Sequence, residues 1–60
     1  MVGAILKSKI NGALFYVDDL KKEGGSSYYI ISELGTDKRV ACGKEWFEKG
    51  IMQNLEIVEG

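Results

Sequence analysis

The sequence has no histidine, no proline and a single cysteine among its 60 residues. One cysteine cannot form an internal disulfide, and without histidine or a second thiol there is no zinc-ligand spacing. A lone thiol without a disulfide framework is typical of a reducing compartment. The composition therefore predicts a fold stabilised by tight packing or by oligomerisation, with no metal and no cofactor.

Long apolar runs are also missing. The longest, AIL and ALFYV, are far too short to cross a bilayer, and no charged start followed by an apolar stretch indicates a signal peptide. The formal net charge of −1 gives no general attraction to nucleic acid or anionic lipid. With 45% hydrophobic residues, the chain is typical of one soluble globular domain over residues 1–60. We expect a cytoplasmic protein that does not contact a membrane.

The clearest local pattern is KINGAL, because Asn-Gly between apolar runs is the strongest short signal for a type I′ hairpin. With Asn11 and Gly12 in the turn, Ile10 lies opposite Ala13. Strand alternation then sorts the flanking residues into two faces. The inner face is nearly all apolar: Ala4, Leu6, Ile10, Ala13, Phe15 and Val17. The outer face is mixed: Ile5, Lys7, Lys9, Leu14, Tyr16 and Asp18.

The remaining chain is divided by its turn residues. Residues 18–27, DDLKKEGGSS, predict a mobile, exposed loop, because two glycines and two serines follow a charged run. The aromatic and β-branched YYIISEL predicts a strand, GTDK a turn and RVAC its partner strand. The final NLEIVE predicts a last strand that pairs with the first, with Leu55 and Ile57 facing the core.

Within the stretch CGKEWFEKGI, residues 42–51, the sequence predicts a short helix or a single 3₁₀ turn over residues 43–50. Glu45 in its first turn and Lys49 in its last suit the helix dipole and form an i, i+4 pair. Gly50 is placed to end the helix in the left-handed conformation, with Ile51 contacting Trp46.

Five short strands with a helical turn before the last one resemble small SH3-like barrels over nearly the whole length. The ending with EWFE is also similar to short phage and prophage reading frames with SH3-like folds. The resemblance implies an all-β, SH3-like five-stranded barrel or a strongly bent sheet. It does not imply binding of proline-rich peptides, because the first connection is a two-residue turn and no ALYDY-like segment occurs.

The large rings and the thiol are expected to be structural. Trp46 or Phe47 would close one end of the core, and we expect Trp46 to be buried there. Cys42 alternates with Val40, and we expect a buried thiol, since no histidine is present to activate it. The alternative role for Trp46 is that of a binding anchor.

An enzyme is not expected. No nucleophile–base pair is present, and the chain is too short to enclose a pocket of the usual size, about 300–1,000 Å³. Asp18 and Asp19 are adjacent on a strand and point to opposite faces, so they cannot act on one atom.

The composition leaves two binding functions open. The first is a small protein-interaction module, or accessory protein, that binds another protein or itself through an apolar and aromatic surface. That surface is expected to comprise Ile5, Leu14, Tyr16, Tyr29 and Ile31. The alternative is nucleic-acid binding, with aromatic rings stacking on bases between cations. The residues for that alternative are Lys21, Lys22, Tyr28, Tyr29, Lys38 and Arg39.

Overall fold

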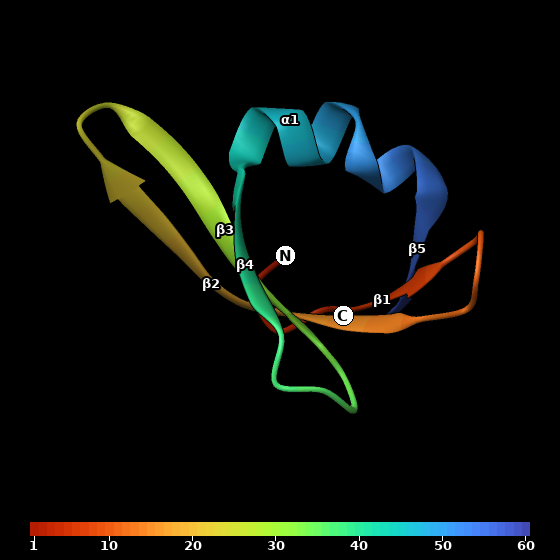
Figure 1. Cartoon of the computed structure of the whole chain (residues 1–60). Helices are drawn as coiled ribbons and strands as arrows, with labels where there is room; N and C mark the ends of the chain where they lie inside the picture. Colours follow the sequence, from red (N-terminus) through yellow and green to blue (C-terminus); the bar gives the residue numbers. More distant parts are fainter.

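The computed structural model describes residues 1–60 and contains one five-stranded antiparallel sheet with a helical segment (Figure 1). The strands are β1 (Ile5–Ser8), β2 (Leu14–Glu23), β3 (Ser26–Glu33), β4 (Arg39–Gly43) and β5 (Leu55–Glu59). The helical segment is the α-helix α1 (Lys44–Lys49) followed by the 3₁₀ helix η1 (Ile51–Asn54). No helix in the structure combines the length and the apolar character that a bilayer crossing requires.

The sheet is open. Its strand order is β4-β3-β2-β1-β5, so β4 and β5 lie at opposite edges and do not pair. The expected closed barrel is therefore wrong, and the sheet is not strongly curled either. The helical segment, residues 44–54, runs from one edge to the other and occupies the space in which closure would occur (Figure 1). The predicted pairing of the last strand with the first is confirmed, with Ser8 opposite Leu55.

The first hairpin has a longer loop than Asn-Gly predicts. Leu6 pairs with Phe15 rather than with Val17, so the register is shifted by two residues. Of the two expected turn residues, Asn11 and Gly12, only Gly12 has a positive φ, which excludes a type I′ turn. Side chains stabilise the longer loop instead: the Ile10 N–H donates to Ser8 Oγ at 3.1 Å, and the Ala13 N–H donates to Asn11 Oδ1 at 3.0 Å.

A shift of two residues leaves every side chain within the two strands on its expected face, because strand alternation has a period of two. Leu6 and Val17 are accordingly buried, as predicted. The exception is Ile10, which was expected in the core and instead lies exposed in the loop.

The second hairpin lies where a mobile loop was expected. Strand β2 continues to Glu23, which pairs with Ser26 across a two-residue turn. Both turn residues, Gly24 and Gly25, have positive φ, at 55° and 86°. Gly-Gly is a recognised signal for this type of turn. The charged residues before it were interpreted as a loop, although they belong to β2.

A β-bulge interrupts β2 beside β3, where the register shifts between Val17 and Asp19. The extra residue, Asp18, accepts a hydrogen bond from Ser32 Oγ. The Arg39 guanidinium lies 3.5 Å from the same carboxylate and donates to Ser32 Oγ at 3.3 Å. This small polar cluster ties the bulge to the edge strand β4 on the face opposite the core.

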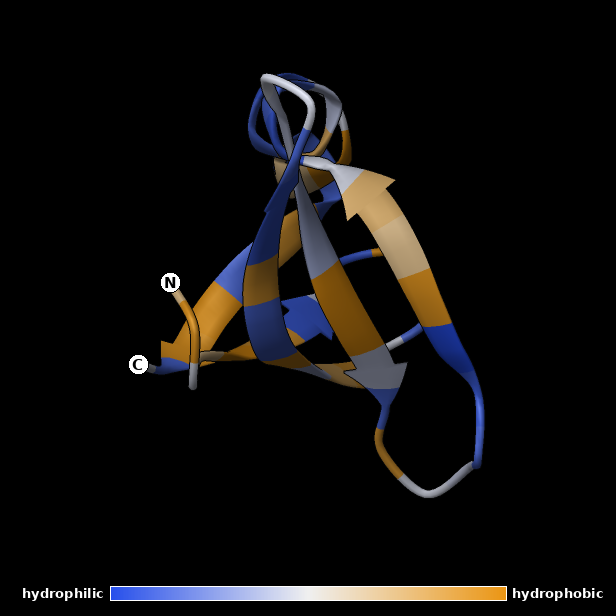
Figure 2. Cartoon of the chain, turned by 90° about the vertical axis from the view of Figure 1, so that its left-hand side faces the viewer, coloured by the Kyte–Doolittle hydropathy of each residue, from blue (hydrophilic) through white to orange (hydrophobic).

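The core lies between the sheet and the helical segment. Apolar bands alternate with polar ones along the strands in Figure 2, which is the pattern of a sheet with one buried face. The prediction of a buried thiol is confirmed for Cys42. Of the two residues of β5 expected in the core, Leu55 is buried and Ile57 is exposed. The buried residues are Ala4, Leu6, Val17, Tyr29, Ile31, Cys42, Phe47 and Leu55.

The helix has the expected ion pair but not the expected end. Lys49 Nζ lies 3.0 Å from Glu45 Oε1. Gly50 has a φ of −111°, so the left-handed ending is wrong, and the chain continues directly into η1. A glycine suits the position for another reason: a Cβ there would lie 3.0 Å from the carbonyl oxygen of Trp46.

Candidate functional site

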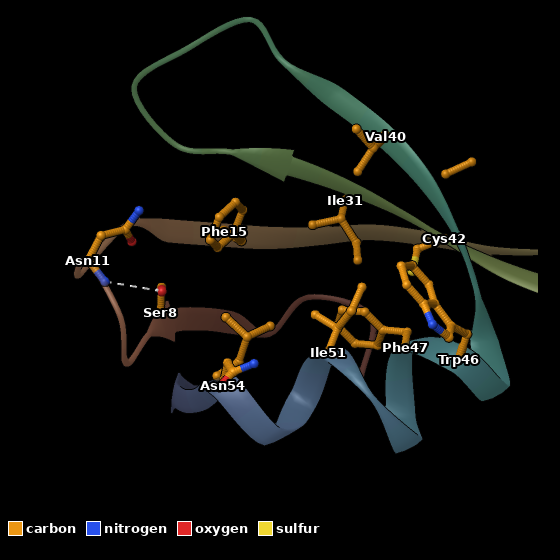
Figure 3. A pocket seen from close by; sticks show the side chains of 12 residues that line it. Ser8, Asn11, Phe15, Ile31, Val40, Cys42, Trp46, Phe47, Ile51 and Asn54 are labelled. Carbon is orange, nitrogen blue, oxygen red and sulfur yellow. Dashed lines mark hydrogen bonds between the residues drawn. The ribbon is translucent and has the colours of Figure 1, made fainter.

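A groove of about 440 Å³ lies between β4, the helical segment and the first hairpin (Figure 3). Nine of the twelve residues that line it are hydrophobic. Its volume is within the usual range for binding pockets, which was not expected for so short a chain. The groove arises because the sheet is open: the helical segment covers the core without filling all the space between the edges.

Two adjacent rings of α1 take opposite positions at this groove. Phe47 is 1% exposed and fills the core beneath it, whereas Trp46 is 67% exposed. Consecutive residues of an α-helix point about 100° apart, so one helix turn cannot bury both rings equally. The prediction that Trp46 is the buried ring is wrong: Phe47 closes the core, and Trp46 lies at the end of the groove near Cys42 (Figure 3).

The wall opposite the helix is formed by β4. Val40 is 59% exposed and alternates with the buried Cys42, so both point toward the same side of the sheet. Ile31, the cross-strand neighbour of Val40, lies beneath it. The groove therefore has a buried floor and an exposed apolar rim made by Val40 and Trp46.

The outer edge of β4 has unpaired backbone groups. The Glu33 N–H donates to the Lys38 carbonyl at 3.1 Å, and residues of an antiparallel pair bond alternately toward and away from each other. Continuing that alternation, Arg39 and Ala41 direct their N–H and C=O groups away from β3. Both are exposed, so the groove is bordered by a free stretch of sheet edge.

The groove offers burial rather than chemistry. None of its lining residues is charged, and Ser8 and Asn11 already accept hydrogen bonds from backbone N–H groups. Burial raises the pKa of the Cys42 thiol, which keeps it protonated and a poor nucleophile at neutral pH. No group of three or more metal-binding side chains occurs in the structure.

The surface predicted to bind protein is divided between two faces. Tyr29 and Ile31 are 4% and 6% exposed and belong to the core, so their assignment to an outer surface is wrong. Ile5 and Tyr16 are cross-strand neighbours on the opposite face, with Leu14 exposed nearby. The parity of YYII was open in the sequence, and pairing with β4 decides it: Tyr29 lies opposite the buried Cys42.

The buried position of Tyr29 is stabilised by two contacts. Its ring centroid lies 5.3 Å from that of Phe47 at an interplanar angle of 59°, a favourable aromatic geometry. Its hydroxyl donates to Glu48 Oε2 at 3.1 Å. Burial, followed by the hydrogen bond to Glu48 and the charge of that carboxylate, raises the pKa of Tyr29.

The residues predicted to bind nucleic acid are not brought together. Lys21 lies opposite Tyr28, near the turn of the second hairpin. Arg39 lies at the end of β4 that is farther from this turn. Two of the cations already have acidic neighbours: Lys21 lies 3.7 Å from Asp19, and Arg39 contacts the Asp18 carboxylate. Tyr29, another member of the predicted set, is buried and cannot stack on a base.

The groove residues missed by sequence reasoning are Val40, Phe15 and Ile51, together with Trp46 in its exposed position. One signal was available: two adjacent large rings on one helical turn require one of them to leave the core. The choice between them was not available, because it depends on how the helix is rotated over the sheet.

Comparison of the chain with protein-family models, with curated proteins and with solved structures finds no match.

Proposed function

We propose that the protein is a small, non-enzymatic protein-interaction module that binds a segment of another protein in the apolar groove beside β4. The observation that supports this most directly is Trp46, a large ring 67% exposed at the end of a mainly apolar groove. Tryptophan is enriched among the residues that dominate binding energy, because it buries a large area at little cost in conformational entropy.

The exposed rim supports the same proposal. Val40 and Trp46 are both more than half exposed, although each lies beside a buried floor. Covering apolar surface stabilises a complex by roughly 25 cal/mol per Å² before the costs of association. A partner segment in the groove would cover Val40 and Trp46, two of the exposed large hydrophobic residues of the chain.

The free edge of β4 indicates how a segment would bind. An extended chain beside β4 would pair with the outward backbone groups of Arg39 and Ala41, which is recognition by strand addition. Alternate side chains of that segment would then point into the groove between Val40 and Trp46. Main-chain hydrogen bonds would hold the segment, and the groove would select apolar side chains.

Panning a random peptide library against the immobilised protein tests this proposal. Selected peptides are synthesised and titrated against wild type, Trp46→Ala and Leu14→Ala, with binding measured by fluorescence polarisation. Leu14 is the matched control, since it is an exposed apolar residue on the opposite face. We expect apolar peptides whose affinity falls about tenfold or more in Trp46→Ala and is unchanged in Leu14→Ala. Loss of binding in Leu14→Ala alone would move the interface to the outer face.

A further inference from the structure

We infer that the segment bound beside β4 carries two apolar residues at alternate positions followed by two acidic residues, and that it runs antiparallel to β4. The inference rests on the proposed function, because it names the chemistry of the segment that the groove would bind. It is carried by the cations at the start of β4, by the residues that β3 already places opposite β4, and by the acids on the other edge of the sheet.

The start of β4 is basic. Lys38 and Arg39 are adjacent there, and both are exposed. Lys38 takes part in no ion pair, although Asp37 precedes it and Glu33 lies opposite it. Arg39 reaches the Asp18 carboxylate through its Nε, so its terminal nitrogens are left for a second carboxylate. Acidic residues of a bound segment would therefore meet two adjacent cations.

Strand β3 shows which side chains suit the neighbours of β4. It places the apolar Ile31 opposite Val40 and the apolar Tyr29 two positions earlier. At its end it places the acidic Glu33 opposite Lys38, where the two backbones are hydrogen-bonded. A segment on the free side of β4 would lie beside the same row of side chains, because a strand contacts its neighbours on both sides. The same order, apolar residues first and acids last, therefore suits it.

The backbone of β4 sets the register of such a segment. Two of its residues would pair with Arg39 and Ala41, whose N–H and C=O groups point away from β3. The residue between those two would point into the groove beside Val40, and the residue before them toward Trp46. Every strand pair in the sheet is antiparallel, which is the more stable arrangement per residue. In that direction the positions opposite Arg39 and Lys38 come last, and these are the two acidic positions.

The other edge of the sheet would reject the same segment. Strand β5 carries Glu56 and Glu59, which are exposed and take part in no ion pair. Like charges on neighbouring strands are destabilising, whereas opposite charges are stabilising. The acidic residues of the segment would therefore direct it to β4 and away from β5.

Designed peptides test this inference. The probe is a dye-labelled peptide with the core Ile-Thr-Val-Glu-Glu between Gly-Ser flanks, and the matched control has Gln-Gln in place of Glu-Glu. Binding is measured by fluorescence polarisation. We expect the acidic peptide to bind about threefold to tenfold more tightly at low salt, and this advantage should shrink as salt screens the charges. Equal affinity of the two peptides, or no binding of either, would overturn the inference.

A charge exchange tests the position of the acids. Lys38→Glu should weaken binding of the acidic peptide about threefold or more, and it should bind a peptide ending in Glu-Lys more tightly than wild type does. Lys22→Glu is the matched control, because it changes the net charge equally and lies near the turn of the second hairpin, opposite Ser27. Circular dichroism checks that both variants are folded. Equal effects of the two variants would overturn the placement of an acid beside Lys38.

The Trp46→Ala variant separates this inference from the proposed function. Peptides that require Trp46 but show no preference for acids would overturn the inference alone. If both the designed peptides and those selected by panning bind Trp46→Ala as tightly as wild type, the proposed function fails with it.

Discussion

Trp46 and Phe47 are neighbours on one turn of α1, yet they lie in opposite environments. Phe47 is enclosed between the helix and the sheet, against the ring of Tyr29, and Trp46 lies at the rim of the groove. The contrast shows that a single short helix can complete a core with one ring and present the next to a partner. Hydrophobicity alone does not distinguish the two, since both are large and apolar.

The largest effect should come from the enclosed ring. Phe47→Ala is expected to cost about 3–5 kcal/mol of unfolding free energy, because it leaves a cavity among residues that cannot collapse to fill it. That is a large fraction of the total stability of a small domain, so much of the variant should be unfolded. Urea denaturation followed by circular dichroism measures the change. A Phe47→Leu control should lose less, and a loss below about 1 kcal/mol for Phe47→Ala would contradict the enclosed position.

A smaller effect should come from the tyrosine beneath Phe47. Tyr29→Phe removes the hydrogen bond to Glu48 and keeps the ring, so we expect a loss of about 0.5–1.5 kcal/mol. Tyr28→Phe is the matched control, because its exposed hydroxyl contacts Glu23 at a long 3.5 Å. The two variants are compared by urea denaturation. A larger loss for Tyr28→Phe would show that the hydroxyl of Tyr29 does not contribute to stability.

The same tyrosine predicts a dependence of stability on pH. The pKa of Tyr29 is raised above its ordinary value of 10.0, so the folded state keeps this proton where the unfolded state loses it. Stability from this group is therefore fully present below pH 10.0 and is lost as the pH rises through the folded pKa. Urea midpoints in a Cys42→Ala background should fall above pH 10.0, and Tyr29→Phe should show a smaller fall. The Cys42→Ala change removes the thiol, whose raised pKa acts in the same direction.

The smallest effect on stability should come from the exposed ring. Trp46→Ala is expected to change the unfolding free energy by less than about 0.5 kcal/mol, as for most surface substitutions. Because Trp46 is the only tryptophan, the emission of wild type reports on it alone, and that emission should be red-shifted and readily quenched by iodide. A blue-shifted emission that iodide quenches little would show that Trp46 is buried, as Phe47 is, and would contradict the contrast between the two rings.

The two hairpins show where local signals were sufficient. Gly24 and Gly25 form the tight turn that Gly-Gly favours, so this dipeptide is by itself a sufficient signal for the second hairpin. Asn11 and Gly12 carry an equally strong signal and yet lie in a longer loop. There, hydrogen bonds from the loop backbone to Ser8 and Asn11 side chains compete with the two-residue turn. Equal local signals thus gave different loops, because side chains outside the dipeptide took part.

The local sequence was enough to determine the strands flanking the first turn, the strand pair around GTDK, the helix with its Glu45–Lys49 pair and the buried Cys42. These features depend on strand alternation, turn residues and contacts a few positions apart, all of which can be recognised within short segments of the sequence. The pairing of the last strand with the first also followed, since an apolar terminal strand requires a neighbour.

Three features depended on contacts distant in the sequence: the open sheet, the face of β3 that is buried, and the choice of Phe47 over Trp46. The buried face of β3 is decided by its pairing with β4, and the other two features are decided by how residues 44–54 lie across the sheet between β4 and β5. That position is a property of the packed whole, because rotating a short helix by one residue exchanges its buried ring at almost no local cost. The groove beside β4 has the same origin, since it exists only where the helical segment leaves the sheet uncovered.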